Sequence, residues 1–156
     1  MPSPAFEFRR IEAIVPKHDT GVEILPARSV SVLLVEDELN LRTVISAALQ
    51  KHGFLVMTAS DGLAATEKFR SAPDDFDVVL LDMTLPGMSG LEVLGEMRRI
   101  RPDARVVLTS ANQVDISRLS VEGNLPVSFI HKPYRLHELL EHLSRAISEG
   151  SGSVKC

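Results

Sequence analysis

Short apolar runs alternate with segments of helical periodicity along most of this chain, and this alternation limits the folds that it can adopt. The runs typical of strands cover residues 30–35, 54–59, 78–81, 105–110 and 127–131. Helical spacing follows each run, in segments near 41–49, 62–72, 91–101, 113–121 and 136–147, of which 113–121 is the least regular. Most of the runs are apolar throughout, as in parallel strands that are buried on both faces. The sequence therefore predicts an α/β fold, a doubly wound (βα)5 sandwich with a parallel five-stranded sheet.

Four of the helical segments have an apolar face that we expect to pack against this sheet. The residues expected to face inward are Leu41, Val44, Ile45, Ala48, Leu49, Ala65, Phe69, Leu91, Leu94, Met97, Leu136, Leu139, Leu140, Leu143 and Ile147. Gly53 and Pro102 are expected to end the first and third helices. Pro86 and Gly87 predict a tight turn before the third helix, because proline presets a turn that glycine completes.

The composition fits one globular domain and argues against several classes of protein. The chain has 156 residues, 44% of them hydrophobic, and a net charge of −4. This charge disfavours a nucleic-acid-binding surface, and no apolar run approaches the roughly 20 residues that cross a bilayer. The single cysteine, Cys156, allows no internal disulfide, and five separated histidines give no zinc-binding pattern. Residues 1–10 lack the apolar stretch of a signal peptide, so we expect a cytoplasmic protein.

The pattern divides the chain into three parts. Residues 1–28 have four prolines among mixed charges and no sustained period, as in an extension or linker. The compact domain is expected at residues 29–148. Residues 149–156 are rich in glycine and serine, and we expect them to form a flexible tail.

Polar side chains follow four of the predicted strands. Acids stand at 36–38 and at Asp82, hydroxyl side chains stand at 109–110, and Lys132 follows the fifth strand. In an open parallel sheet these carboxyl ends meet at one edge, where ligands bind. Two carboxylates about 5 Å apart repel by roughly 3 kcal/mol at an effective dielectric near 20, so we expect either that the cluster holds protons or that a cation neutralises it. Carboxylate oxygens favour Mg2+, and a lysine beside them would make a site that receives a phosphoryl group.

Four segments at these strand ends resemble the receiver domains of bacterial two-component response regulators. They are VLLVEDE at 32–38, VVLLDMTLPGMSG at 78–90, VVLTSA at 106–111 and FIHKPY at 129–134. The resemblance covers residues 29–148 and implies a flavodoxin-like fold with strand order 2-1-3-4-5. It also implies a signalling domain, rather than an enzyme, that takes a phosphoryl group from a histidine kinase or a histidine phosphotransfer protein. The phosphorylated domain would then act on a downstream protein.

The resemblance implies a role for each acid and for the lysine. Asp82 matches the phosphoacceptor, whose carboxylate attacks a phosphohistidine and becomes an acyl phosphate. Asp37 matches the acid that ligates Mg2+ directly, and Glu36 matches its neighbour, which usually acts through a bound water. Thr84 would offer its backbone carbonyl to the metal. Lys132 would pair first with Asp82 and then with the phosphoryl oxygens.

The resemblance also implies a switch. Ser110 matches the switch hydroxyl because Ala111 follows it, and Thr109 is the substitute. Phe129 stands where the family has an aromatic residue that turns inward on phosphorylation. The turn would reshape the surface formed by the helix at 113–121, the last strand and the last helix.

Three further positions have implied roles. The Lys132–Pro133 bond is expected to be cis, which would set the direction of the lysine. Thr84 and Asn112 would flank the phosphoryl group and would tune its dephosphorylation by controlling the access of water.

Three other functions were weighed against this one. A haloacid-dehalogenase-like phosphatase needs a second aspartate two residues after Asp82, where this chain has Thr84. A flavodoxin needs a phosphate loop rich in serine, threonine and glycine after the first strand, where residues 36–38 are all acidic. A receiver-like interaction module that is not phosphorylated would retain the fold without the chemistry.

The context of the domain stays open between two arrangements. It could be a stand-alone regulator, since few residues follow 148, or the receiver of a hybrid sensor kinase. Residues 20–26, TGVEILP, resemble the end of a histidine-kinase ATP-binding domain, as the second arrangement would require.

Overall fold

Five parallel strands form one sheet in the structure, a computed structural model that describes residues 29–112 and 128–152. The strands are β1 (Ser31–Val35), β2 (Leu55–Ala59), β3 (Val78–Asp82), β4 (Val106–Ser110) and β5 (Ser128–His131). They lie in the order β2-β1-β3-β4-β5, and each neighbouring pair is parallel. The predicted α/β fold and its strand order are therefore confirmed.

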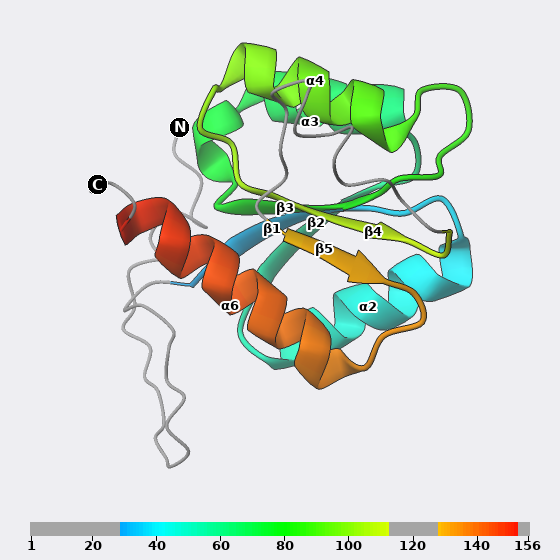
Figure 1. Cartoon of the computed structure of the whole chain (residues 1–156), viewed down its shortest axis with the longest axis vertical. Coiled ribbons are helices and arrows are strands. Elements are labelled where there is room, and N and C mark those ends of the chain that lie inside the picture. Colours follow the sequence, from blue (N-terminus) through cyan, green and yellow to red (C-terminus); the bar gives the residue numbers. More distant parts are fainter. Residues whose placement is uncertain (1–28, 113–127, 153–156) are drawn as a thin grey trace.

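Helices cover both faces of this sheet (Figure 1). They are α2 (Leu39–Lys51), α3 (Gly62–Ser71), α4 (Gly90–Ile100) and α6 (Leu136–Gly152), with a short 3-10 turn η1 (Pro73–Asp75). Helices α2 and α6 lie on one face, and α3 and α4 lie on the other (Figure 1). This is the doubly wound arrangement in which a crevice forms beyond the carboxyl ends of the strands.

The hydrophobic core has two halves, one on each face, because successive side chains of a strand point in opposite directions. Along β1, Leu33 packs in the half that contains Phe69 and Met97 of α3 and α4. Leu34 packs in the other half, which contains residues of α2 and α6 such as Leu49. All these side chains are essentially inaccessible to solvent. The predicted burial of the central strands on both faces is thus confirmed.

Two residues predicted to face the core are exposed. Val44 has 63% of its surface accessible, because α2 meets the sheet through the narrower stripe of Ile45 and Leu49. Leu136 is 39% accessible, and it is the first residue of α6, whose burial begins one turn later at Leu139. Helical spacing indicates which side of a helix faces inward but not the width or the start of the buried stripe.

The observed boundaries differ from the predicted ones mainly at the end of the chain. Helix α6 continues to Gly152, so the predicted tail from 149 onward is in part helical. None of the helices within residues 29–112 and 128–152 is both long and apolar enough to span a bilayer. The predicted helix at 113–121, the extension at 1–28 and the segment at 20–26 all lie outside the described residues.

The connection from β3 to α4 folds tightly against the strand that it leaves. Gly87 has a φ of +76°, and the amide of Met88 donates to the carbonyl of Pro86 at 2.9 Å, as the predicted turn requires. A Cβ atom on Gly90 would lie 2.5 Å from the backbone carbonyl oxygen of Asp82, so only glycine fits there. The first turn of α4 therefore lies directly against the end of β3.

Candidate functional site

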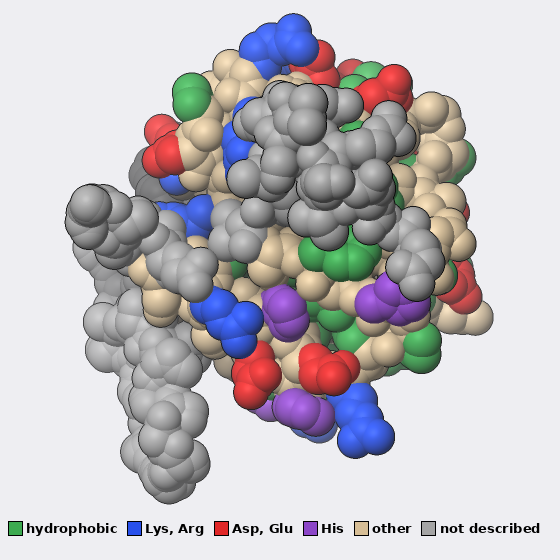
Figure 2. Space-filling view, viewed as in Figure 1, with side chains coloured by type: hydrophobic (Ala, Val, Ile, Leu, Met, Phe, Trp, Pro, Cys, Tyr) green, Lys and Arg blue, Asp and Glu red, His purple; other side chains and the backbone are tan. Residues whose placement is uncertain are grey.

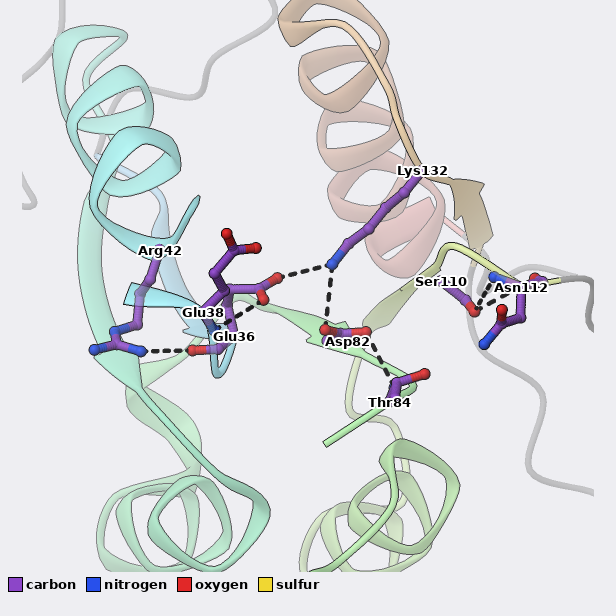
Figure 3. Close-up of polar contacts among 8 residues, drawn as sticks. All are labelled: Glu36, Glu38, Arg42, Asp82, Thr84, Ser110, Asn112 and Lys132. Carbon is purple, nitrogen blue, oxygen red and sulfur yellow. Dashed lines mark hydrogen bonds and ion pairs between the residues drawn. The ribbon is translucent and has the colours of Figure 1, made fainter. Parts of the chain in front are cut away.

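The carboxyl ends of β1, β3 and β5 bring one group of charged side chains together, as Figure 3 shows. Glu36 directly follows β1, Asp82 is the last residue of β3, and Lys132 directly follows β5. Strand β1 is next to β3, and only β4 lies between β3 and β5. The carboxyl ends of the three strands therefore lie on the same edge of the sheet. Glu36, Asp82 and Lys132, which were predicted from the strand ends, do meet.

Three carboxylates form the acidic part of this site. Glu36, Asp37 and Asp82 each offer an oxygen, and these oxygens lie within 4.8 Å of one another. Glu36 and Asp82 are buried, with 3% and 5% of their surface accessible, whereas Asp37 is exposed. The cluster is therefore buried on the sheet side and open to solvent on the side of Asp37.

Lys132 joins two of these carboxylates. Its Nζ lies 3.0 Å from Oε1 of Glu36 and 3.2 Å from Oδ2 of Asp82. The side chain of Lys132 is only 17% accessible, so these ion pairs are shielded from water more than surface pairs are. One ammonium group thus serves two buried acids.

The charges in the site do not balance. Burial raises the pKa of Glu36, and the hydrogen bond from Lys132 offsets only part of this effect. Burial acts to lower the pKa of Lys132, but the hydrogen bond to Glu36 and the charge of Asp82 outweigh it, so the net pKa is raised. The raised pKa keeps Lys132 protonated, and this one ammonium group stands beside a cluster of three carboxyl groups.

Backbone amides hold the two buried carboxylates in place. The amide of Thr84 donates to Oδ1 of Asp82 at 3.0 Å, and the amide of Glu38 donates to Oε2 of Glu36 at 3.2 Å. Each buried acid thus has one oxygen bound to Lys132 and the other bound to the chain just after it. Both side chains are fixed before any ligand arrives.

The structure places Ser110 at the edge of the site rather than against Asp82. Its hydroxyl accepts from the amide of Asn112 at 3.0 Å and lies 3.4 Å from the carbonyl of that residue (Figure 3). Ser110 is buried, and Asn112 is exposed. Thr109, which is also buried, is the register partner of Asp82 across β3 and β4.

Phe129 precedes Lys132 by three residues in the chain, and Pro133 directly follows it. Phe129, on β5, is half-buried and packs against the half of the core below α3 and α4. The Lys132–Pro133 peptide bond is cis, the isomer that the resemblance implies.

A shallow groove of about 490 Å3 lies beside the site on β5 and α6. Its lining residues are Phe129, Ile130, His131, Lys132, Pro133, Glu138, Glu141 and His142. Figure 2 shows histidine and acidic side chains gathered on this face of the molecule. Nδ1 of His142, one of these lining residues, lies 2.8 Å from Oγ of Ser128 at the start of β5.

Two residues that contact or adjoin the site were not among those predicted from the sequence. Arg42, in α2, donates from Nη1 to the backbone carbonyl of Glu36 at 2.8 Å. Tyr134 is half-buried against the α2 and α6 half of the core. Burial raises its pKa, and the charges of Glu36 and Asp82 raise it further. The position of Tyr134, two residues after Lys132, could have indicated that it lies near the site. No feature of the sequence indicates that Arg42 contacts a backbone carbonyl.

The donors present fit a hard divalent cation. All three side chains offer oxygen, and no cysteine or histidine joins the cluster among the described residues. Oxygen donors with surplus negative charge suit Mg2+ or Ca2+ better than zinc. This edge of the sheet therefore offers donors that could hold a divalent cation.

A family model, the response regulator receiver domain, matches residues 32–144, which is most of the chain. The matched region starts at the second residue of β1 and ends within α6, so it contains the other four strands and every residue of the site described above.

Individual proteins agree with the family model. The chain is 34% identical over 120 residues to the sensory transduction protein RegX3 of Mycobacterium tuberculosis, covering 77% of this chain and 52% of RegX3. It is 32% identical over 111 residues to the sensor kinase CckA of Brucella abortus, covering 71% of this chain and 12% of CckA. The response regulator TrrA of Thermotoga maritima, solved in complex with Mg2+-BeF, superposes with a TM-score of 0.67 at 35% identity, covering 75% of this chain and 98% of that one.

The matches to RegX3 and to CckA each cover only part of the longer protein. The chain spans about half the length of RegX3 and about an eighth of CckA. In each of the two, the match covers a stretch of 111 to 120 residues of this chain. The chain belongs to the receiver-domain family of two-component response regulators.

Proposed function

We propose that Asp82 is the phosphoacceptor of this receiver domain. The observation that supports it most directly is the convergence of the carboxylates of Glu36, Asp37 and Asp82, the first and last of which bind the ammonium group of Lys132. Asp82 is the member of this group that lies at the centre of the sheet edge, at the end of β3, with both oxygens already hydrogen-bonded. A carboxylate held in this way needs little reorganisation to attack a phosphorus atom.

Glu36, Asp37 and Asp82 would hold Mg2+, with the backbone carbonyl of Thr84 as a further ligand. When bound, the cation would offset the surplus negative charge and the charge of the incoming phosphoryl group. The complex of TrrA with Mg2+-BeF supports this choice of cation. In this protein Glu36 is anchored to Lys132 and to the amide of Glu38, so its carboxylate is positioned before the cation binds.

The transfer step forms one bond and breaks one bond. A carboxylate oxygen of Asp82 attacks the phosphorus of a phosphohistidine, the P–N bond breaks, and the imidazole leaves with the electron pair and takes up a proton. The product on this chain is an aspartyl phosphate. Lys132, which now contacts Asp82 at 3.2 Å, would pair with the phosphoryl oxygens.

The switch would follow from the new hydrogen-bond acceptor. A phosphoryl oxygen would attract the hydroxyl of Ser110 away from Asn112, to which it is bonded in this structure. The movement of Ser110 would leave space for Phe129 to turn further inward. The surface that changes would include β5, α6 and residues 113–121.

Thr84 and Asn112 are proposed to set the lifetime of the phosphorylated state. Both side chains are exposed and flank the two contacts of the site, at Asp82 and at Ser110. Their size and polarity would control the approach of the water that hydrolyses the acyl phosphate. Substitution of either is expected to change dephosphorylation more than phosphorylation.

The partners proposed for the domain are a histidine kinase or a histidine phosphotransfer protein as donor, and a downstream protein as target. The likeness to RegX3 and to CckA is compatible with a regulator and with a hybrid sensor kinase. A donor that is itself phosphorylated from ATP would place the reaction in the cytoplasm. The domain would act as a phosphoacceptor that catalyses only its own phosphorylation and dephosphorylation.

Incubation with acetyl phosphate and Mg2+ tests this proposal without a cognate kinase. We expect one phosphoryl group on the wild-type protein, seen by intact-mass spectrometry, and none on Asp82→Asn. Asp103→Asn, which changes an exposed acid near the opposite edge of the sheet, serves as the matched control and should be phosphorylated like the wild type.

Two results would contradict the proposal. If the wild-type protein does not become phosphorylated although Mg2+ binds, the domain is a receiver-like interaction module. If it turns over many equivalents of p-nitrophenyl phosphate, it is a phosphatase, despite having Thr84 where such enzymes need a second acid.

A further inference from the structure

Arg42 makes a contact that none of the roles above explains. It lies in the first turns of α2 and is half-buried, and its Nη1 donates to the backbone carbonyl of Glu36 at 2.8 Å (Figure 3). The carbonyl belongs to the residue that starts the acidic loop, which we define as residues 36–38. Arg42 thus connects a regular helix to the irregular segment that presents two of the three acids.

The remaining contacts of the acidic loop show what Arg42 adds. At its start, the amide of Glu36 donates to the carbonyl of Ala59 at 3.1 Å. At its end, the carbonyl of Glu38 accepts from the amide of Arg42 at 2.9 Å, and the amide of Glu38 donates to the carboxylate of Glu36. Arg42 therefore attaches both ends of the acidic loop to α2. Its side chain binds the carbonyl of Glu36, and its backbone amide binds the carbonyl of Glu38.

We infer that Arg42 is a positioning residue that holds the acidic loop in the geometry for binding a divalent cation. This inference rests on the proposed function, because it concerns the same cation. Its guanidinium group touches a backbone carbonyl, so it would act through the orientation of Glu36 and Asp37 rather than as a ligand. Outer-shell partners that orient ligands typically change metal affinity by roughly 10–100-fold when they are removed.

The charge of Arg42 would act in the opposite direction. A guanidinium group near a cation site repels the cation, so removal of the charge alone would tighten binding. Removal of the positioning contact would weaken binding, because the loop would have to be ordered as the cation enters. The sign of the change in Mg2+ affinity therefore separates the two roles.

Calorimetric titration with Mg2+ of wild type, Arg42→Met and Arg42→Lys measures that sign. We expect Arg42→Met to raise the dissociation constant roughly tenfold, the lower end of the range for outer-shell partners. Arg42→Lys keeps a donor and should give an intermediate value. Arg70→Met is the control, because Arg70 pairs with Glu96 on the surface of α3 and α4, and it should bind Mg2+ like the wild type.

Hydrogen exchange of the metal-free proteins gives a second readout. If Arg42 orders the acidic loop, the amides of Asp37 and Glu38 should exchange faster in Arg42→Met, while the amides of β3 exchange at the wild-type rate. A folding defect would instead accelerate exchange throughout the sheet, and in that case Arg42→Lys supplies the comparison.

The outcomes separate this inference from the proposed function. Unchanged or tighter Mg2+ binding by Arg42→Met overturns the positioning role and leaves phosphorylation of Asp82 untouched. Unchanged exchange of the acidic loop overturns it as well. If the wild-type protein binds no Mg2+, the proposed function fails, and hydrogen exchange still decides whether Arg42 orders the loop.

Discussion

Glu36 and Lys132 stand 96 residues apart in the chain, and their Oε1 and Nζ atoms form an ion pair of 3.0 Å at the edge of the sheet. This contact is slightly shorter than the one between Lys132 and Asp82, at 3.2 Å. The ammonium group is therefore shared between two acids from different strands. It links β5 to β1 as well as to the central strand β3.

Replacement of this shared cation should destabilise the fold. In Lys132→Met we expect a loss of about 2–3 kcal/mol in the free energy of unfolding, because two buried carboxylates lose their counterion. The loss should stay below the roughly 3–5 kcal/mol typical of a fully buried pair, since Lys132 retains some exposure. Urea denaturation measures it. Addition of Glu36→Gln to Lys132→Met should recover part of the loss, and a purely additive double mutant would contradict the shared pair.

Mg2+ should stabilise the wild-type protein. At about ten times its dissociation constant, a ligand that binds only the folded state adds about 1.4 kcal/mol to the free energy of unfolding. Asp37→Asn should abolish the gain, whereas the stability without metal should change little because Asp37 is exposed. Thermal melting with Mg2+ and with excess EDTA checks both statements. An equal gain in the two proteins would show that Asp37 is not a ligand.

Gly90→Ala should disturb the site through the backbone. The added methyl group would lie 2.5 Å from the carbonyl oxygen of Asp82 and from the Cα of Met83, so β3 and α4 must move apart. We expect a loss of about 1–3 kcal/mol in stability and slower phosphorylation by acetyl phosphate.

Ser89→Ala is the control for this change. It removes the capping box at the same end of α4 but places no atom against β3. It should cost about 1 kcal/mol and leave the rate of phosphorylation unchanged. Equal rates for Gly90→Ala and Ser89→Ala would show that close packing at Gly90 does not matter for the site.

His142 should make stability depend on pH. Burial lowers its pKa below 6.5, and Arg145 lowers it further, against the smaller opposing effects of Glu138 and Glu141. The unfolded chain therefore binds a proton at His142 more readily than the folded protein, so stability is lost as the pH falls below 6.5. In His142→Asn this part of the pH dependence should disappear, as measured by urea denaturation across the range. The same slope in both proteins would contradict the assignment to His142.

The fold could be predicted because the central strands are buried on both faces. Runs such as 78–81 are typical of strands that are buried on both faces, and their alternation with helical segments favours a parallel sheet between two layers of helices. The exposure of Val44 and of Leu136 could not be predicted in the same way. It depends on where each helix first meets the sheet, which is a property of the packed molecule.

The part of the site that consists of residues at strand ends could be predicted from the sequence. Glu36, Asp82 and Lys132 meet because parallel strands place their carboxyl ends together. The hydrogen bond of Ser110 to Asn112 and the contact of Arg42 with a carbonyl depend on side-chain conformation, and residue spacing does not specify this.

Tyr134 is the only tyrosine in a chain that has no tryptophan. Its ring packs against the α2 and α6 half of the core, and it follows Lys132 by two residues in the chain. All of the intrinsic ultraviolet emission from tyrosine therefore originates beside the site. The molecule contains its own optical probe, through which occupancy of that edge could be followed in real time without any attached dye.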